Sequence, residues 1–99
     1  MTEVRWTDQA VDDLSAIREF ISRDSLRYGR LVAERLFEAT FRIGTFPRSG
    51  RIVPEVGRDD LREIIVGEYR IVYRLSGRAA VVLTVFRSSR LFPVNLGEP

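Results

Sequence analysis

The feature that most constrains the fold is the run of residues 62–74, which reads as two strands around a tight turn. Gly67 and Glu68 stand at its centre, and a glycine at the first central position permits the positive φ of a type II′ hairpin turn. β-branched residues, tyrosines and arginines recur on both sides of the turn. We expect the strand after it to place positions 69, 71, 73 and 75 on one face of a sheet and positions 70, 72 and 74 on the other.

Three strands are predicted in the C-terminal half, at residues 61–66, 69–75 and 79–86. The last of them is apolar at every position but one from 81 to 85, which is typical of a strand covered on both faces, so we expect it to be central. Residues 3–6 alternate polar and apolar side chains and predict a short opening strand. Residues 48–60 contain the Ser-Gly, Pro and Gly signals of a loop.

Two amphipathic helices are predicted between the opening strand and this loop. The first has an apolar stripe at Ala10, Leu14, Ile17 and Ile21, and the second at Val32, Leu36, Ala39, Ile43 and Phe46. Thr7 is expected to cap the first helix, and Gly44 with Pro47 to end the second. The break at residues 24–25 is short, which predicts an antiparallel helical hairpin.

The predicted order is therefore β-α-α-β-β-β, an α+β fold in which an N-terminal helical hairpin packs on a small, mostly antiparallel sheet. Residues 1–99 make a single domain. The segment 91–99 is apolar but is interrupted by prolines, so we expect a flexible C-terminal tail that needs a partner to become ordered.

Composition excludes several kinds of chemistry. The chain has neither histidine nor cysteine, and all 16 of its basic residues are arginine. These absences exclude Ser-His-Asp and Cys-His catalysis, zinc held by His or Cys, and lysine Schiff bases, so we expect no metal and no cofactor. No apolar run reaches the ~18 residues that span a bilayer, and the N-terminus lacks a secretory signal. We expect a cytoplasmic protein without membrane contact.

Arginines gather in the C-terminal half. Residues 1–47 carry 7 arginines and 8 acids, a charge of −1, and residues 48–99 carry 9 and 6, a charge of +3. Arginine stabilises anionic charge but stays protonated and cannot act as a base. We expect a target to be bound by Arg70, Arg74, Arg87 and Arg90. The simpler interpretations are a surface ion pair of Arg70 with Glu63 or Glu68, and a solvated strand end for Arg87 and Arg90.

A ribonuclease made from these residue types would need arginines around the phosphorane, Glu63 or Glu68 as the base and a tyrosine as the acid. Its residues would be Arg62, Arg70, Arg87, Tyr69 and Tyr73. For both tyrosines the simpler interpretation is a core residue with its hydroxyl at the rim.

Three phenylalanines lie beside the main helical stripes, at Phe20, Phe37 and Phe41. They widen the apolar surface of the helices beyond what one sheet can cover. A surplus of this kind usually marks a protein partner.

Four segments, taken in order, resemble the RelE/ParE family of toxins of bacterial toxin–antitoxin modules, and the resemblance is greatest to the ParE branch. The segments are residues 6–17, 46–51, 62–74 and 85–90. The resemblance implies the same β-α-α-β-β-β fold and a cognate, ParD-like antitoxin whose extended segment wraps over the helices and sheet in a hetero-oligomer. We expect the antitoxin to contact Phe20, Phe37, Phe41, Tyr73 and Arg87.

The resemblance also implies two possible targets. ParE-like members bind and poison DNA gyrase and are not enzymes, whereas RelE-like members cut mRNA in the ribosomal A site. Arg70 matches the arginine of the RelE-like hairpin, and Arg87 matches the basic residue of its last strand. RelE-like members commonly have a tyrosine or histidine near the C-terminal end, and neither occurs after Arg87 in this chain.

This departure favours a ParE-like gyrase inhibitor with no catalytic site and no need for direct nucleic-acid contact. A ribosome-dependent mRNA endoribonuclease is the alternative. A non-toxic relative, retained for its interaction with the antitoxin, is the third hypothesis.

Overall fold

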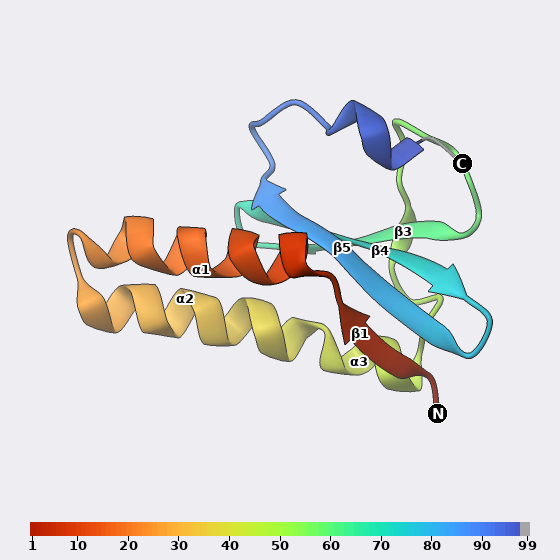
Figure 1. The fold of residues 1–99 in the computed structure, drawn as a ribbon, viewed down its shortest axis with the longest axis horizontal. Helices are drawn as coiled ribbons and strands as arrows, with labels where there is room; N and C mark the ends of the chain where they lie inside the picture. Colours follow the sequence, from red (N-terminus) through yellow and green to blue (C-terminus); the bar gives the residue numbers. More distant parts are fainter. Residues whose placement is uncertain (98–99) are drawn as a thin grey trace.

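The computed structural model describes residues 1–97, without the side chain of Val94. Its elements are β1 (Glu3–Trp6), α1 (Asp8–Ser22), α2 (Leu26–Ala39), α3 (Phe41–Thr45), β2 (Arg51–Ile52), β3 (Leu61–Val66), β4 (Tyr69–Ser76), β5 (Ala79–Arg87) and η1 (Val94–Gly97). Figure 1 shows α1 and α2 side by side along one side of the sheet, with their connecting turn projecting beyond it, while η1 lies on the other side. Among residues 1–97, no helix is long and apolar enough to cross a membrane.

The strands form one sheet in the order β1-β5-β4-β3-β2. β1 runs parallel to β5, and the other three pairings are antiparallel. The predicted α+β fold is therefore confirmed. β5 is an interior strand, as expected for an apolar run, although β4 is the middle one. The positive φ predicted for Gly67 is also confirmed, at 56°.

Two features differ from the prediction. The second helical pattern is divided between α2 and α3, because Thr40 donates its hydroxyl to the carbonyl of Phe37 at 2.7 Å and so competes with the regular helical pattern. The predicted loop at residues 48–60 contains the short strand β2, which pairs with Glu63 and Arg62 of β3.

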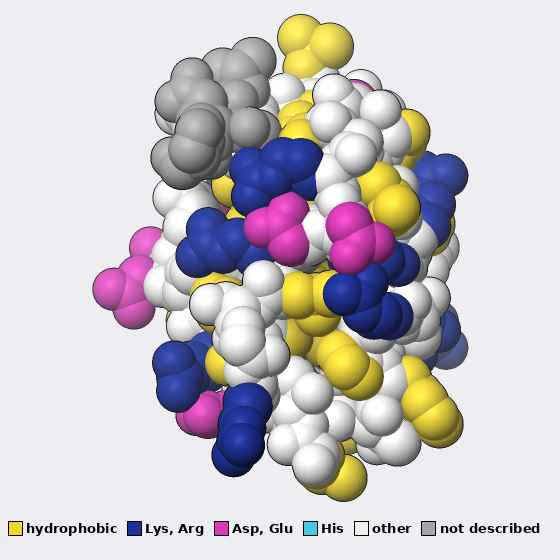
Figure 2. All heavy atoms as spheres, turned by 90° about the vertical axis from the view of Figure 1, so that its right-hand side faces the viewer, with side chains coloured by type: hydrophobic (Ala, Val, Ile, Leu, Met, Phe, Trp, Pro, Cys, Tyr) yellow, Lys and Arg dark blue, Asp and Glu magenta, His cyan; other side chains and the backbone are white. Residues whose placement is uncertain are grey.

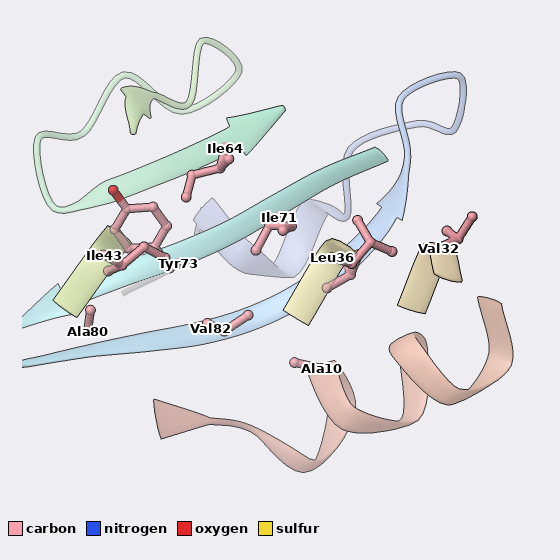
Figure 3. Close-up of a cluster of buried hydrophobic side chains, with 10 residues drawn as sticks. Ala10, Val32, Leu36, Ile43, Ile64, Ile71, Tyr73, Ala80 and Val82 are labelled. Atoms are coloured by element: carbon pink, nitrogen blue, oxygen red, sulfur yellow. The ribbon is translucent and has the colours of Figure 1, made fainter. Parts of the chain in front are cut away.

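The sheet has an apolar cluster on each face. On the helix side, the buried cluster comprises Ala10, Val32, Leu36, Ile43, Ile64, Ile71, Tyr73, Ala80, Val82 and Val85, most of which Figure 3 labels. On the other side, Val53, Leu61, Val72 and Phe86 form a smaller cluster, against which Phe92 and Leu96 pack. The expected division of β4 between two faces is confirmed, with Ile71 and Tyr73 on the helix side and Val72 opposite. The flexibility expected for residues 91–99 stays a prediction, and residues 98–99 lie outside the described chain.

A β-bulge attaches α1 to the sheet. Tyr73 is opposite Val82 and Val72 is opposite Thr84, so Leu83 of β5 has no counterpart in β4. The Thr7 hydroxyl caps α1, as predicted, by accepting from the N–H of Ala10 at 3.0 Å. It also donates to the carbonyl of Leu83 at 3.0 Å. The start of the first helix is thereby fixed to the irregular point of the strand.

The junction between helices and sheet depends on Gly50 and Tyr73. The Tyr73 side chain is fully buried beside Ile43 (Figure 3). Its hydroxyl donates to the Pro47 carbonyl at 2.7 Å and accepts from the Gly50 N–H at 3.0 Å. A Cβ atom at position 50 would lie 2.5 Å from that hydroxyl oxygen and 2.7 Å from the carbonyl oxygen of Glu63. Only glycine leaves room for this arrangement.

We expect Gly50→Ala to lower the free energy of unfolding by about 1–3 kcal/mol, the usual cost of forcing an extra methyl group into a packed interior. Urea unfolding followed by circular dichroism measures this change. Thr45→Ala, at an exposed position nearby, is the matched control and should change stability by less than ~0.5 kcal/mol. Equal stabilities for the two variants would contradict the proposed close contact.

Candidate functional site

The arginine that the sequence singled out lies in a buried ion pair. Arg70, on β4, is only 6% exposed. Its two terminal nitrogens donate to the two carboxylate oxygens of Glu55, each at 2.7 Å, and its Nε donates to Oε1 of Glu63 at 2.7 Å. Arg70 therefore pairs with Glu63, as expected, but the ion pair is buried and not on the surface. Glu55 is a second carboxylate partner that was not expected. Glu68 pairs instead with Arg87, at 3.3 Å.

Glu63 is shared between two arginines. It is 1% exposed, and its second oxygen accepts from Nε of Arg51 at 2.5 Å. The resulting cluster of Arg51, Glu55, Glu63 and Arg70 holds two positive and two negative charges. Within residues 1–97, no buried side-chain nitrogen or oxygen lacks a hydrogen-bond partner. The desolvation of these charges is thus balanced locally.

Two aromatic rings lie against the Arg70 guanidinium. Its central carbon is 5.3 Å from the ring centre of Phe86 on β5 and 5.3 Å from that of Phe92 in the C-terminal segment. The rings themselves meet edge to face, with centres 6.1 Å apart. Such cation–π contacts strengthen when the cation is desolvated. Arg70 thus connects β3, the loop that carries Glu55 and the C-terminal segment.

This pairing shifts the ionisation of both partners. The hydrogen bonds from Arg70 lower the pKa of Glu55 from its ordinary value of 4.5 to about 2. The hydrogen bonds to Glu55 raise the pKa of Arg70 further above its ordinary value. Arg70 is therefore permanently charged and already neutralised, so contact between Arg70 and a target stays a prediction that requires Glu55 or Phe92 to move.

The Arg62 guanidinium is also held by contacts within the protein. Its side chain is 12% exposed and pairs with a carboxylate oxygen of Asp59 at 2.8 Å. It donates in addition to the carbonyl oxygens of Asp59 at 2.8 Å and of Gly50 at 3.1 Å. These bonds fix the loop between β2 and β3, and they leave the guanidinium little capacity for a phosphate.

The two tyrosines belong to the helix-side layer, in agreement with the simpler interpretation. Burial raises the pKa of Tyr73, whose hydroxyl is held by Pro47 and Gly50, and it raises the pKa of Tyr69 as well. Tyr69 is paired with Arg87 across the β4–β5 ladder, and Arg70 is paired with Phe86. Since paired residues point to the same face, Tyr69 and Arg87 lie on one face and Arg70 on the other. The structure does not bring the five ribonuclease candidates together.

The remaining target-binding candidates are exposed but lie at two ends of the sheet. Arg87 is the last residue of β5 and Arg90 follows it, whereas Arg74 is opposite Val81, near the β4–β5 turn. Figure 2 views the end of the molecule with that turn, where arginine side chains alternate with acidic ones. The ion pairs there include Arg48 with Asp59 and Arg58 with Asp60. Among residues 1–97, Arg87 is ion-paired with Glu68 at 3.3 Å, while Arg74 and Arg90 make no ion pair, so both ends of the sheet present exposed positive charge.

Two of the aromatic candidates, Phe37 and Phe41, form an exposed row on α2 and α3. Phe37 is 47% exposed and Phe41 is 60% exposed. Their ring centres lie 5.3 Å apart, and Phe37 is 5.8 Å from Trp6. Phe20 is also exposed, but it lies near the turn between α1 and α2, where Arg23 covers its ring at 5.5 Å. The structure thus groups Phe37 with Phe41 and leaves Phe20, Tyr73 and Arg87 elsewhere.

Sequence reasoning missed Glu55 and Phe92, the residues that complete the surroundings of Arg70. Both lie outside periodic segments, in a loop and after the last strand. The one available signal was an arginine at an interior strand position, which needs carboxylates nearby. Among residues 1–97, no group of three or more acidic side chains is placed to hold a metal ion.

We expect Glu63→Gln to lower the free energy of unfolding by about 3 kcal/mol or more, because it leaves a buried arginine without half of its countercharge. Chemical denaturation measures the loss. Glu68→Gln is the matched control, since its ion pair with Arg87 is exposed and should contribute at most ~1 kcal/mol. A Glu63→Gln variant as stable as this control would show that the buried pair does not hold the fold together.

Stability should also depend on pH through Glu55. A carboxyl whose pKa is lower in the folded than in the unfolded protein stabilises the fold fully above the unfolded value and no longer does so below the folded one. We expect the free energy of unfolding to fall as the pH drops from 4.5 to about 2, and to fall less in Glu55→Gln. Urea titrations across this range test the difference. Parallel pH profiles for the two proteins would contradict it.

Comparisons with known proteins agree on one family. The family model described as "ParE toxin of type II toxin-antitoxin system, parDE" matches residues 4–92. Toxin RelE2 of Caulobacter vibrioides is 30% identical over 92 residues, covering 92% of this chain and 100% of that protein.

Two solved structures share the fold. One belongs to the chromosomal ParDE system of P. aeruginosa, with a TM-score of 0.74 and 18% identity over 88% of this chain and 96% of that one. The other belongs to the RelBE2 complex of Mycobacterium tuberculosis, with a TM-score of 0.55 and 24% identity over 87% and 96%. The chain belongs to the ParE toxin family and is a toxin of a type II toxin–antitoxin system.

Proposed function

We propose that this toxin acts as ParE-like proteins do, by binding and poisoning DNA gyrase in the cytoplasm, and that a ParD-like antitoxin neutralises it. The observation that carries the proposal is that the Arg70 guanidinium is already paired and covered within the protein. Its guanidinium is saturated by two carboxylates and covered by two rings. A nuclease needs an arginine that can receive the charge of a transition state, whereas an inhibitor that acts by binding needs only a complementary surface.

The binding surface in this proposal is the exit of β5. Arg87 and Arg90 are exposed there, Arg87 in an exposed ion pair with Glu68 at 3.3 Å, and the sequence has no acidic residue between positions 69 and 97. Exposed charges of one sign steer an oppositely charged partner and set its orientation. Arg74, at the opposite end of the sheet, would bind the target only if the target extends that far. Arg70 would not touch the target but would keep the end of β5 and the C-terminal segment in position.

The antitoxin would cover the apolar row of Phe37 and Phe41. Aromatic side chains that stay half exposed in the isolated protein are typical anchors of protein interfaces. Phe20 would extend this contact toward the turn of the helical hairpin. Tyr73 and Arg87 were also expected to touch the antitoxin. Since Tyr73 is buried, its share would be to hold the junction at Gly50 in place.

The ribosome-dependent endoribonuclease remains the second candidate, because the 30% identical relative is named RelE2. It would require Arg70 to leave Glu55 and Glu63 and to approach Arg87 from the other face. The third candidate, a non-toxic relative, predicts unchanged growth when the chain is expressed alone.

A gyrase assay with the antitoxin-free toxin tests the proposal. We expect supercoiling to be inhibited and cleaved DNA to accumulate, with both effects reversed by the antitoxin. Arg87→Ala and Arg90→Ala should each need about tenfold more protein for the same effect, the usual loss at an important interface arginine. Arg78→Ala is the matched control, an exposed arginine at the opposite end of β5, and should behave as the wild type.

Normal supercoiling at saturating toxin would reject the gyrase proposal. The same preparation added to a translating extract then tests the alternative. Transcripts cut at codon boundaries, with loss of cutting in Arg70→Ala, would establish the endoribonuclease. Intact transcripts and unimpaired growth would leave the non-toxic relative.

A further inference from the structure

A cavity lies between α2 and the turn of the β3–β4 hairpin. It has a volume of about 240 Å³. Tyr28, Val32, Arg35 and Leu36 line it from α2, and the hairpin lines it from the other side. An apolar cavity of about 150 Å³ already holds a benzene molecule, so this one has room for a large side chain of a partner.

The floor of the cavity is apolar. Val32 and Leu36 are buried and belong to the helix-side cluster. Tyr69 of β4 is half-buried and packs against the same cluster. Tyr28, by contrast, is exposed at the mouth. A tyrosine beside a pocket with a buried apolar floor is typical of the residues that contribute most to protein–protein affinity.

Arginines lie on both sides of the mouth. Arg35 of α2 is exposed, and among residues 1–97 it makes no ion pair. On the opposite side, Tyr69 is paired with Arg87 across the β4–β5 ladder, so the two lie on one face and the cavity adjoins the exit of β5. Glu68 is the acidic residue of the lining, and it pairs with Arg87 at 3.3 Å.

The pair of Glu68 with Arg87 leaves the mouth positive. Both side chains are largely exposed, and an exposed ion pair contributes little, so a carboxylate of a partner can take the place of Glu68. Two arginines against one glutamate also give a net positive charge. The surface around the cavity is therefore complementary to an acidic partner.

These features fit a protein partner better than a nucleic acid. Binding to nucleic acid depends on several basic side chains along the phosphates. The lining of this cavity has one arginine and one glutamate, and the glutamate would repel a phosphate. Tyrosine and arginine around an apolar pocket are instead the residues that are enriched in protein interfaces.

We propose that this cavity receives an apolar side chain from an acidic segment of the toxin's protein target, and that carboxylates of this segment pair with Arg35 and Arg87. The inference rests on the proposed gyrase target and extends its binding surface from the exit of β5 to α2. Tyr28 and Tyr69 would enclose the inserted side chain, and Arg35 would orient the segment.

Binding of the full toxin chain to gyrase without DNA tests the inference. Tyr28→Ala and Arg35→Glu should each raise the Kd about tenfold or more, and should raise the toxin concentration that inhibits supercoiling by a similar factor. The effect of Arg35→Glu should decrease at high salt, because exposed charges are screened.

Leu31→Ala and Arg27→Glu are the matched controls. Both positions are exposed on α2 and do not line the cavity, so the Kd should change less than about threefold. Binding to the antitoxin and to a DNA fragment is measured with the same variants. Thermal unfolding checks that all four fold alike, and Arg35→Glu, at an exposed position, still tests the inference if Tyr28→Ala is less stable.

The wild-type toxin is measured first, so that two kinds of failure can be distinguished. A wild type that neither binds nor inhibits gyrase would overturn the proposed function and the inference with it. Gyrase binding by the wild type with equal Kd values for the cavity and control variants would overturn the inference alone. A loss confined to antitoxin binding would also overturn it and assign the cavity to the antitoxin, and a loss confined to DNA binding would assign it to nucleic acid.

Discussion

Arg70 is the residue on which most of the C-terminal half depends. A guanidinium removed from water costs several kcal/mol unless charges and hydrogen bonds replace its hydration. Glu63 and Glu55 supply the charges, and Phe86 and Phe92 cover the planar faces. These partners come from β3, the loop between β2 and β3, β5 and the C-terminal segment, so one side chain determines how four parts of the chain approach each other.

The position of this cluster also bears on the division of the family by target. Arginines on the sheet would serve a nuclease only if they were available to substrate, and here two of the candidates, Arg70 and Arg62, are used to fix loops. Tyr73 is used in the same way at the helix–sheet junction. Arg62, Arg70 and Tyr73 thus all make structural contacts, and exposed arginines remain at both ends of the sheet.

The local parts of this fold could be predicted from the sequence, and the long-range parts could not. The positive φ of Gly67, the alternation on β4 and the helical stripes from Ala10 to Ile43 depend on neighbours in sequence, and the structure confirms them. Phe46, expected at the end of the second stripe, is instead 65% exposed. Thr40 interrupts the second helix through a local hydrogen bond, and the apolar stripe continues across it, so the pattern predicted one uninterrupted helix. Glu55 and Phe92 could not be assigned to Arg70, because loops and tails have no periodicity from which a contact follows. Periodicity gave the face on which Arg70 lies, but its burial depends on those distant residues.

The parallel pairing of β1 with β5 has a consequence for how the chain folds. The bond from Thr7 to Leu83 spans 76 residues, so the first strand reaches its place only after β5 is present. Contacts between distant positions slow folding, because the chain must close a long loop before they form. During synthesis, the helical hairpin can form early from local contacts, while its sheet-facing side stays uncovered until β5 has emerged. A nascent toxin would therefore lack a complete sheet until β5 has emerged.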